Sequence, residues 1–192
     1  MIERTLILIK PDGVKRGLIG QIISRFENLG LKIIGIKMIH PNKEFAKKHY
    51  PVTEEWYQKV GTNSLTDTKK YGMKAKDYFG TENPIEIGKK VHQWNVEFLT
   101  SGPLIAMALE GVHAIETVRK LAGTTIPNLA SPGTIRGDFS THSALSANAK
   151  KRAIANLVHS SGNKEEAERE IRLWFSESEL YEYETILEKH FN

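Results

Sequence analysis

The sequence predicts a single domain, residues 1–192, in which helices pack on one sheet. Short apolar runs recur along the chain, and stripes of apolar residues at helical spacing lie between them. With 192 residues and 40% hydrophobic content, the chain is long enough to bury a core. The order strand, helix, strand, helix, strand, helix, strand fits a doubly wound sheet or a split β-α-β sandwich of the ferredoxin type, and periodicity does not decide between them.

The first strand and helix follow directly from the start of the chain. Thr5–Ile9 is an apolar run, and it predicts a buried strand that ends in the turn-forming sequence Lys10-Pro11-Asp12-Gly13. Residues 19–29 carry apolar side chains at helical spacing, followed by Gly30, which is free to take a positive φ. This segment therefore predicts a helix that ends at Gly30.

A second strand and a short helix come next. The isoleucine-rich segment 31–39 predicts the strand, and Asn42 is the predicted N-cap of a helix that runs to Tyr50. From about residue 51 to residue 82 the composition shifts to Thr, Lys, Gly and Tyr without clear periodicity. We interpret residues 51–82 as a first insertion on the surface.

The middle of the chain predicts a helix and a third strand. Asn83-Pro84 has the form of a helix start, and Gly102-Pro103 stops the apolar stripe that follows it, formed by Ile87, Val91, Trp94 and Phe98. Residues 104–109 are apolar without alternation, so they predict a strand buried on both faces.

The last third begins with a helical stripe closed by Gly123, formed by Ile115, Val118, Leu121 and Ala122. Residues 124–138 predict a long polar loop, and 140–154 predict a second insertion with a helical turn or two. A short strand at 156–159 precedes a helix with Asn163 as its N-cap and Glu166 three residues on. The tail, 176–192, is expected to pack on the outside.

Composition excludes several classes of protein. Cysteine is absent, which rules out disulfide scaffolds, thiolate zinc sites and thiol nucleophiles. No apolar run reaches the roughly 18 residues that a membrane span needs, and the start of the chain does not resemble a signal peptide, so we expect a cytoplasmic protein. The net charge of +4 tolerates anionic partners without forming a nucleic-acid-binding tail.

Two charged residues interrupt apolar helix faces. Arg119 shares the stripe of the helix that ends before Gly123, either because it binds an anion or because it lies at the edge of the stripe and extends to water. Glu170 falls on the inner face of the last helix. A buried carboxylate needs a hydrogen-bond donor, and an imidazole N–H would serve.

Seven histidines are present, and no two are three or four residues apart, so a helical zinc pair is absent. His159 leaves an apolar segment into the small residues Ser160, Ser161 and Gly162, which suggests a ring that is accessible yet fixed. The alternative is a histidine that is merely hydrogen-bonded at a strand end.

Two turns could contact a phosphate. Lys10 closes the first strand, and residues 132–138 combine glycines with Arg136, whose guanidinium is a forked donor suited to phosphate. Each could instead be an ordinary turn. Neither of the usual glycine-rich nucleotide motifs occurs, so a nucleotide site would have to be built another way.

Four motifs together resemble the nucleoside diphosphate kinase family, in order and in spacing. They are Ile9-Lys10-Pro11-Asp12-Gly13, Ser101-Gly102-Pro103, Pro132-Gly133-Thr134-Ile135-Arg136-Gly137-Asp138-Phe139 and Asn156-Leu157-Val158-His159-Ser160-Ser161. The resemblance covers about residues 1–50, 99–139 and 155–192. It implies an α+β fold, a ferredoxin-like sandwich whose four-stranded antiparallel sheet carries packed helices.

The resemblance also implies a ping-pong reaction in which a histidine carries the γ-phosphoryl group from a nucleoside triphosphate to a nucleoside diphosphate. By match to the motif, His159 is the nucleophile, and a neutral imidazole needs no separate base. Glu170 matches the carboxylate that orients this ring through its other nitrogen. Ser161 and Asn156 match polar residues beside the histidine and the sugar.

Lys10, Arg119 and Arg136 match the phosphate-binding cations of the family. Thr125 matches a phosphate-contacting hydroxyl, and Tyr50 matches the aromatic hydroxyl near the transferred group. The resemblance implies Mg²⁺ as cofactor, held mainly by the nucleotide phosphates and not by a protein metal site. It also implies a homo-oligomer, tetramer or hexamer, with no membrane partner.

The chain departs from the family pattern in two places. The usual His-Gly-Ser-Asp is replaced by His159-Ser160-Ser161-Gly162, so the acid after the serine is missing. Counting back from Ser101 places His92, with Trp94 close by, where an aromatic residue stacks on the base. Two rival functions stay open: a nucleic-acid-binding protein and a regulatory protein without activity, both on the same fold. Dispersed basic residues and the absence of paired exposed aromatics speak against nucleic acid.

Overall fold

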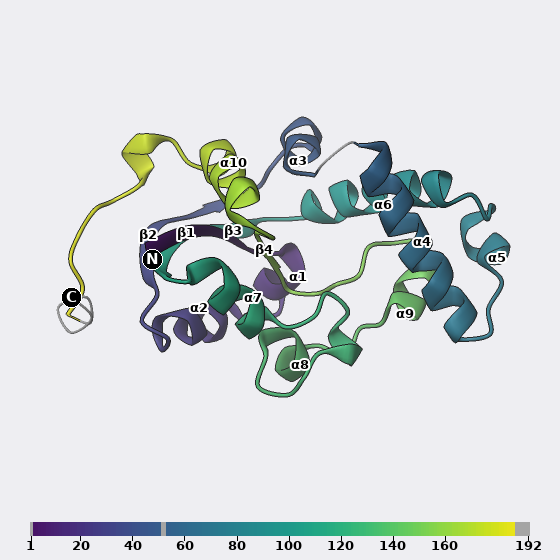
Figure 1. Cartoon of the computed structure of the whole chain (residues 1–192), viewed down its shortest axis with the longest axis horizontal. Helices are drawn as coiled ribbons and strands as arrows, with labels where there is room; N and C mark the ends of the chain where they lie inside the picture. The colour runs from purple at the N-terminus through teal and green to yellow at the C-terminus, as the bar shows by residue number, and fades with distance from the viewer. Residues whose placement is uncertain (1, 51–52, 187–192) are drawn as a thin grey trace.

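A four-stranded sheet forms the centre of the molecule in the computed structural model, which describes residues 2–50 and 53–186 (Figure 1). Its strands are β1 (Ile2–Ile9), β2 (Lys32–Ile39), β3 (Leu104–Val112) and β4 (Val158–Ser160). Their spatial order is β2-β3-β1-β4, and every neighbouring pair is antiparallel. This is the order of a split β-α-β sandwich, so the ferredoxin-like alternative is confirmed and the doubly wound sheet is excluded.

Helices cover both faces of the sheet because side chains of a strand alternate between its two faces. Ile7 and Ile9 of β1 face the helices α2 (Ile19–Glu27) and α7 (Ala114–Ala122), where they pack with Phe26 and Val118. Two short helices lie on this side as well, α1 (Pro11–Lys15) and α8 (Ile135–Phe139).

Leu6 and Leu8 face the opposite layer, where they pack with Leu99 and Trp174. This layer consists of α3 (Lys43–His49), α6 (Pro84–Leu99) and α10 (Lys164–Trp174). Both faces of β1 and β3 are therefore buried, which confirms the buried strands predicted from the uninterrupted apolar runs at 5–9 and 104–109.

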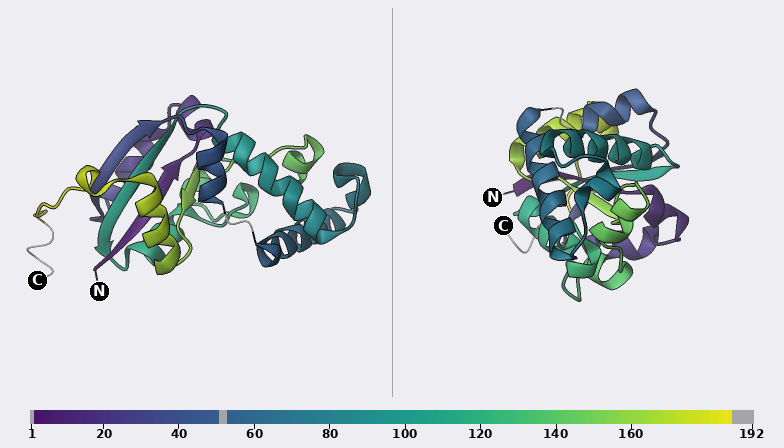
Figure 2. Two further views of the ribbon diagram at one scale, coloured as in Figure 1. Left: turned by 90° about the horizontal axis from the view of Figure 1, so that it is seen from above. Right: turned by 90° about the vertical axis from the view of Figure 1, so that its right-hand side faces the viewer.

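The two predicted insertions meet at one end of the molecule, beyond the sheet (Figure 2). The first forms α4 (Glu54–Lys70) and α5 (Ala75–Phe79), and the second forms α9 (Ala144–Ala149). The sequence analysis predicted no helix within the first insertion, but α4 is a helix of 17 residues packed along α6. Residues 51 and 52 of this insertion lie outside the described residues.

The way in which α4 packs on α6 explains why the sequence of α4 shows no apolar stripe. A Cβ added at Gly61 would lie 1.8 Å from the carbonyl oxygen of Pro84, and one at Gly88 would lie 2.1 Å from that of Tyr57. The helices thus meet backbone to backbone through glycines. Such a contact leaves no apolar periodicity in the sequence.

Other boundaries differ in detail from the prediction. The predicted turn after Lys10 is the helix α1, and the predicted loop 124–138 contains α8 and the 3-10 helix η1 (Pro127–Leu129). The predicted N-caps Asn42 and Asn163 are confirmed, and the predicted helix start at Asn83-Pro84 has Asn83 as its N-cap. The side chains of Asn42, Asn83 and Asn163 each accept hydrogen bonds from the first turn of their helices.

The described part of the tail lies on the outside, as predicted, against β2. After the 3-10 helix η2 (Glu177–Glu179), the backbone N–H of Tyr181 donates to the carbonyl of Ile34 at 2.7 Å. The Tyr183 hydroxyl donates to the carbonyl of Ile33 at 2.8 Å. Residues 187–192 of the tail lie outside the described residues. Across the described chain, no helix has the length and apolar content needed to span a bilayer.

Candidate active site

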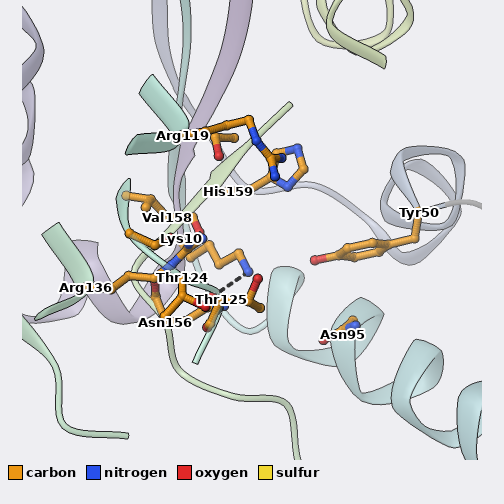
Figure 3. Close-up of a pocket in the computed structure, with 12 residues that line it drawn as sticks. Lys10, Tyr50, Asn95, Arg119, Thr124, Thr125, Arg136, Asn156, Val158 and His159 are labelled. Atoms are coloured by element: carbon orange, nitrogen blue, oxygen red, sulfur yellow. Dashed lines mark hydrogen bonds between the residues drawn. The ribbon is translucent and has the colours of Figure 1, made fainter. Parts of the chain in front are cut away.

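A cavity of about 330 Å³ lies between the sheet and α6 (Figure 3). Most of the predicted site residues line it, although they come from segments far apart in the sequence: Lys10, Tyr50, Arg119, Thr125, Arg136, Asn156 and His159. The other two, Ser161 and Glu170, are buried beside the imidazole of His159. The fold therefore brings all the predicted site residues to one place.

The imidazole of His159 is fixed by a buried carboxylate. β4 pairs with β1 so that His159 lies opposite Leu8, and its Nε2 is 3.0 and 2.9 Å from the two carboxylate oxygens of Glu170 on α10. Glu170 is only 1% exposed. A carboxylate can only accept, so Nε2 carries the hydrogen and Nδ1 keeps a lone pair. The donor expected for Glu170 is thus an imidazole.

Ser161 completes the shell around this carboxylate. Its hydroxyl donates to Oε2 of Glu170 at 2.7 Å and accepts the backbone N–H of Leu6 at 3.3 Å. Burial raises the pKa of Glu170, while His49 and the hydroxyl of Ser161 act in the opposite direction. The carboxylate is held in place by the donors His159 and Ser161 and by the guanidinium of Arg169, which lies 3.5 Å from its Oε1.

The electrostatic surroundings keep His159 neutral. Burial, and after it the positive charge of Lys10, lower the pKa of His159 well below its ordinary value of 6.5. A histidine with a lowered pKa is uncharged at neutral pH, and its free nitrogen can act as a nucleophile. Within the described chain, Nδ1 of His159 has no hydrogen-bond partner.

A strained turn places His159 after Asn156. Leu157 has a φ of +69°, and the N–H of Val158 bonds to the carbonyl of Asn156 at 2.8 Å, which closes a γ-turn. Asp12 stabilises this turn, because its Oδ2 accepts the N–H of Leu157 at 3.0 Å. Non-glycine residues rarely adopt this conformation, so the turn depends on the bonds around it.

Lys10 and Asn156 form a polar floor in the cavity. The Lys10 ammonium donates to Oδ1 of Asn156 at 2.8 Å, and Nδ2 of Asn156 donates to the carbonyl of Thr125 at 3.0 Å. Lys10 is only 8% exposed. Burial, and then the charge of Arg136, lower the pKa of Lys10 to about 8. An anion here would be drawn to a cation that is poorly solvated.

Arg136 serves the backbone as well as the cavity. Its guanidinium donates to the carbonyls of Asn156 at 3.1 Å, Gly123 at 2.6 Å and Val158 at 2.6 Å. Burial, and then the charge of Arg119, lower its pKa to about 10. Three of the five guanidinium hydrogens are thus used, and two are left for a ligand.

Arg119 lies at the exposed edge of the α7 stripe, as the alternative interpretation predicted, and it also lines the cavity.

The missing acid at Gly162 has a structural explanation near the guanidinium of Arg119. The N–H of Gly162 donates to Oε2 of Glu166 at 2.6 Å. A Cβ at Gly162 would lie 2.4 Å from that oxygen and 3.4 Å from Nη1 of Arg119. A carboxylate from one turn later in the chain therefore fills this space.

Sequence reasoning missed three residues of the site. Asp12 supports the γ-turn, and Asn95 of α6 lines the cavity. His49 is buried, with its ring 4.4 Å from that of His159 between centroids, and its Nδ1 accepts from the indole of Trp174 at 3.3 Å. The sequence offered one signal, since His49 directly precedes the predicted Tyr50.

The two candidates for base stacking lie outside the cavity. Trp94 stacks on Phe79, 5.8 Å away, in a separate apolar cluster. His92 packs against Tyr50, Trp56 and Tyr57. Neither His92 nor Trp94 lines the cavity, whereas Asn95, the residue after Trp94, does.

One group of possible metal ligands occurs in the described residues. Ligand atoms of His49, His159 and Glu170 lie within 4.8 Å of one another. Nε2 of His159 is already hydrogen-bonded to Glu170, Nδ1 of His49 already accepts from the indole of Trp174, and His49 and Glu170 are buried. The cavity itself, as far as the chain is described, is lined by three cationic side chains and no carboxylate. Such a lining suits phosphate oxygens better than a free metal ion.

Comparison with known proteins agrees with this geometry. The family model described as nucleoside diphosphate kinase matches residues 3–67 and 84–180. A nucleoside diphosphate kinase of Pyrobaculum aerophilum is 46% identical over 181 residues, which cover 94% of this chain and 99% of that protein. One of Borreliella burgdorferi is 40% identical, with 95% and 93% covered.

Solved structures give the same result. The crystal structure of an NDP kinase from Pyrobaculum aerophilum superposes with a TM-score of 0.92 at 45% identity, covering 95% of this chain and all of that one. A transition-state mimic of the Borrelia burgdorferi enzyme, with bound vanadate and ADP, superposes with a TM-score of 0.77 at 38% identity, covering 98% and 96%. This chain therefore belongs to the nucleoside diphosphate kinase family.

Proposed function

We propose that this chain is a nucleoside diphosphate kinase, a phosphotransferase that moves the γ-phosphoryl group of a nucleoside triphosphate to a nucleoside diphosphate through a phosphohistidine. One observation carries the proposal. The ring of His159 is bound through Nε2 by Glu170 and lines a cavity that also presents Lys10, Arg119 and Arg136.

In the first half-reaction, the lone pair on Nδ1 of His159 attacks the γ-phosphorus. The N–P bond forms while the bond from phosphorus to the bridging oxygen breaks, and the nucleoside diphosphate leaves with those electrons. No proton has to be removed from the nucleophile, because Nδ1 is already unprotonated. The second half-reaction is the reverse, with another nucleoside diphosphate as acceptor.

Glu170 is a positioning residue in this reaction. Positive charge develops on the imidazole as the N–P bond forms, and the carboxylate 2.9 Å from Nε2 offsets it. Ser161 holds the carboxylate in place from the other side. The ring is thus oriented before the nucleotide arrives.

The three cations neutralise phosphate oxygens, which is the main requirement of phosphoryl transfer. Tyr50 and Thr125 would supply hydroxyls near the phosphates, and Asn156, held by Lys10, would contact the sugar. Mg²⁺ would enter bound to the nucleotide phosphates, since the described cavity offers it no carboxylate. Its contribution there is to neutralise charge on the transferred group.

Labelling with γ-labelled ATP and Mg²⁺ tests the proposal. We expect an acid-labile, alkali-stable phosphate on the protein that GDP or CDP discharges. His159→Ala should abolish labelling while the protein stays folded, and His40→Ala, at an exposed histidine, should label normally.

Two results would reverse the assignment. Labelling that persists in His159→Ala would remove His159 from its role. Tight, salt-resistant nucleic-acid binding without any label would favour the nucleic-acid-binding rival, and absence of both would favour a regulatory protein. A single domain over 1–192, a tetrameric or hexameric assembly and a cytoplasmic location stay predictions from the resemblance.

A further inference from the structure

The cavity has two chemically different ends (Figure 3). His159 and Arg119 lie at one end, where phosphate would react. Asn95 projects from α6 at the other end, and Lys10 and the Tyr50 hydroxyl lie between Asn95 and the end with His159. A nucleotide whose terminal phosphorus faces His159 has its nucleoside at the other end of the phosphate chain. That end is where Asn95 lies.

The amide of Asn95 is not used by the fold. It is half-buried, and none of residues 2–50 and 53–186 hydrogen-bonds to it. Its neighbour on the exposed side of the same helix, Gln93, donates to Glu97 at 2.9 Å. A partly buried amide without a protein partner is available to a polar group of a ligand.

Asn95 is also held on a rigid element. Its helix α6 packs against α4, where Gly88 meets the backbone of Tyr57, and Trp94 is stacked on Phe79. A site built on a supported helix keeps its geometry better than one on a loop. The first insertion, through α4 and α5, therefore supports the helix that carries Asn95.

We propose that Asn95 hydrogen-bonds the edge of the nucleotide base and thereby permits broad base use. This inference rests on the proposed function, which sets the direction of the nucleotide. An amide has both a donor and an acceptor, and it can turn over to exchange them. It can therefore face the amino edge of adenine or cytosine as well as the oxo edge of guanine or uracil.

A carboxylate at the same place would lose this tolerance, because it can only accept. Asn95→Asp should favour bases with an exocyclic amino group over those with an oxo group. We expect the ratio of kcat/KM for CTP over UTP, and for ATP over ITP, to rise about tenfold relative to the unchanged protein. Asn95→Leu should lower kcat/KM for all four nucleotides and leave both ratios near their original values.

Gln93→Glu is the matched control, since it makes the same change of amide to carboxylate on the exposed side of α6. Its ratios should not move. A general loss of structure or of phosphate affinity changes all nucleotides alike, so the ratios isolate the base contact. Ratios within twofold of the original in Asn95→Asp would overturn the inference.

A second result would also overturn it. If Asn95→Leu changes the preference for ATP over dATP and Asn95→Asp leaves the base ratios unchanged, the amide contacts the sugar and not the base. Failure of the proposed function is distinguishable, because the unchanged protein would then form no labelled phosphohistidine with any nucleotide.

Discussion

Replacing Glu170 by Gln should slow formation of the phosphohistidine without unfolding the protein. The carboxylate accepts from Nε2 of His159 at 2.9 Å and from the hydroxyl of Ser161 at 2.7 Å. A carboxylate fixes the hydrogen of the imidazole on Nε2 because it has no donor of its own. An amide removes the charge, and it can also turn its NH₂ group toward the ring.

The magnitude follows from these contacts. A hydrogen bond to a charged group contributes about 1.5–3 kcal/mol, and a neutral one about 0.5–1.5 kcal/mol, so the exchange costs about 1–2 kcal/mol in the transition state. This corresponds to a rate reduced by about 5- to 30-fold. If the amide donates to Nε2, the hydrogen moves to Nδ1 and the lone pair needed for attack is lost, which would make the reduction larger.

The assay is the rate of label transfer from γ-labelled ATP to the protein in a single turnover. Glu168→Gln is the matched control, because Glu168 lies on the same helix and is about half exposed, with its contact to Arg172 stretched to 3.9 Å. Thermal unfolding should show Glu170→Gln folded, since burying an uncharged amide costs less than burying a carboxylate. A labelling rate within threefold of the original would refute the role assigned to Glu170.

Two further predictions concern a cation and a helix contact. Because the pKa of Lys10 is lowered to about 8, the ammonium is lost above that pH, and KM for ATP should rise about tenfold between pH 7 and pH 9. Lys10→Arg should flatten this profile because a guanidinium stays protonated, and an unchanged slope in that variant would contradict the assignment. Gly88→Ala should lower the free energy of unfolding by about 1–3 kcal/mol, measured by denaturant titration, because its Cβ would lie 2.1 Å from the Tyr57 carbonyl oxygen. Gly20→Ala, with no atom within 4 Å of the added Cβ, is its control, and equal effects of the two substitutions would argue against the close helix contact.

Much of the site could be predicted because its residues stand out locally. Glu170 was placed on an inner helix face by periodicity, and its burial demanded a donor of the kind that His159 provides. Lys10, Arg136 and His159 each stand at the end of a predicted strand or in a glycine-containing turn. Periodicity could not predict that these residues lie close together, because β4 pairs with β1 across about 150 residues of chain. The resemblance to a family supplied that topology.

The parts that were missed share a physical reason. Gly61 and Gly88 let α4 and α6 meet through their backbones, and a contact of this kind has no apolar signature. Counting back from Ser101 selected His92 and Trp94, which lie on the same turn of α6 as Asn95 but outside the cavity. Asp12 acts on the backbone of Leu157, a long-range bond that no local pattern indicates.

The site also shows how catalysis and folding place opposite demands on the same groups. Glu170 and Lys10 are buried. Burial raises the pKa of Glu170 and lowers the pKa of Lys10, and both shifts favour the uncharged form. Keeping each group charged in the folded protein therefore costs free energy, because burial removes the hydration that stabilises a charge in water. Neighbouring groups offset part of this cost before a nucleotide binds: Ser161 and His159 donate to Glu170, and Asn156 accepts from Lys10. The remaining cost for Lys10 is relieved when phosphate oxygens enter, so a poorly solvated cation contributes more to binding a nucleotide than an exposed one would.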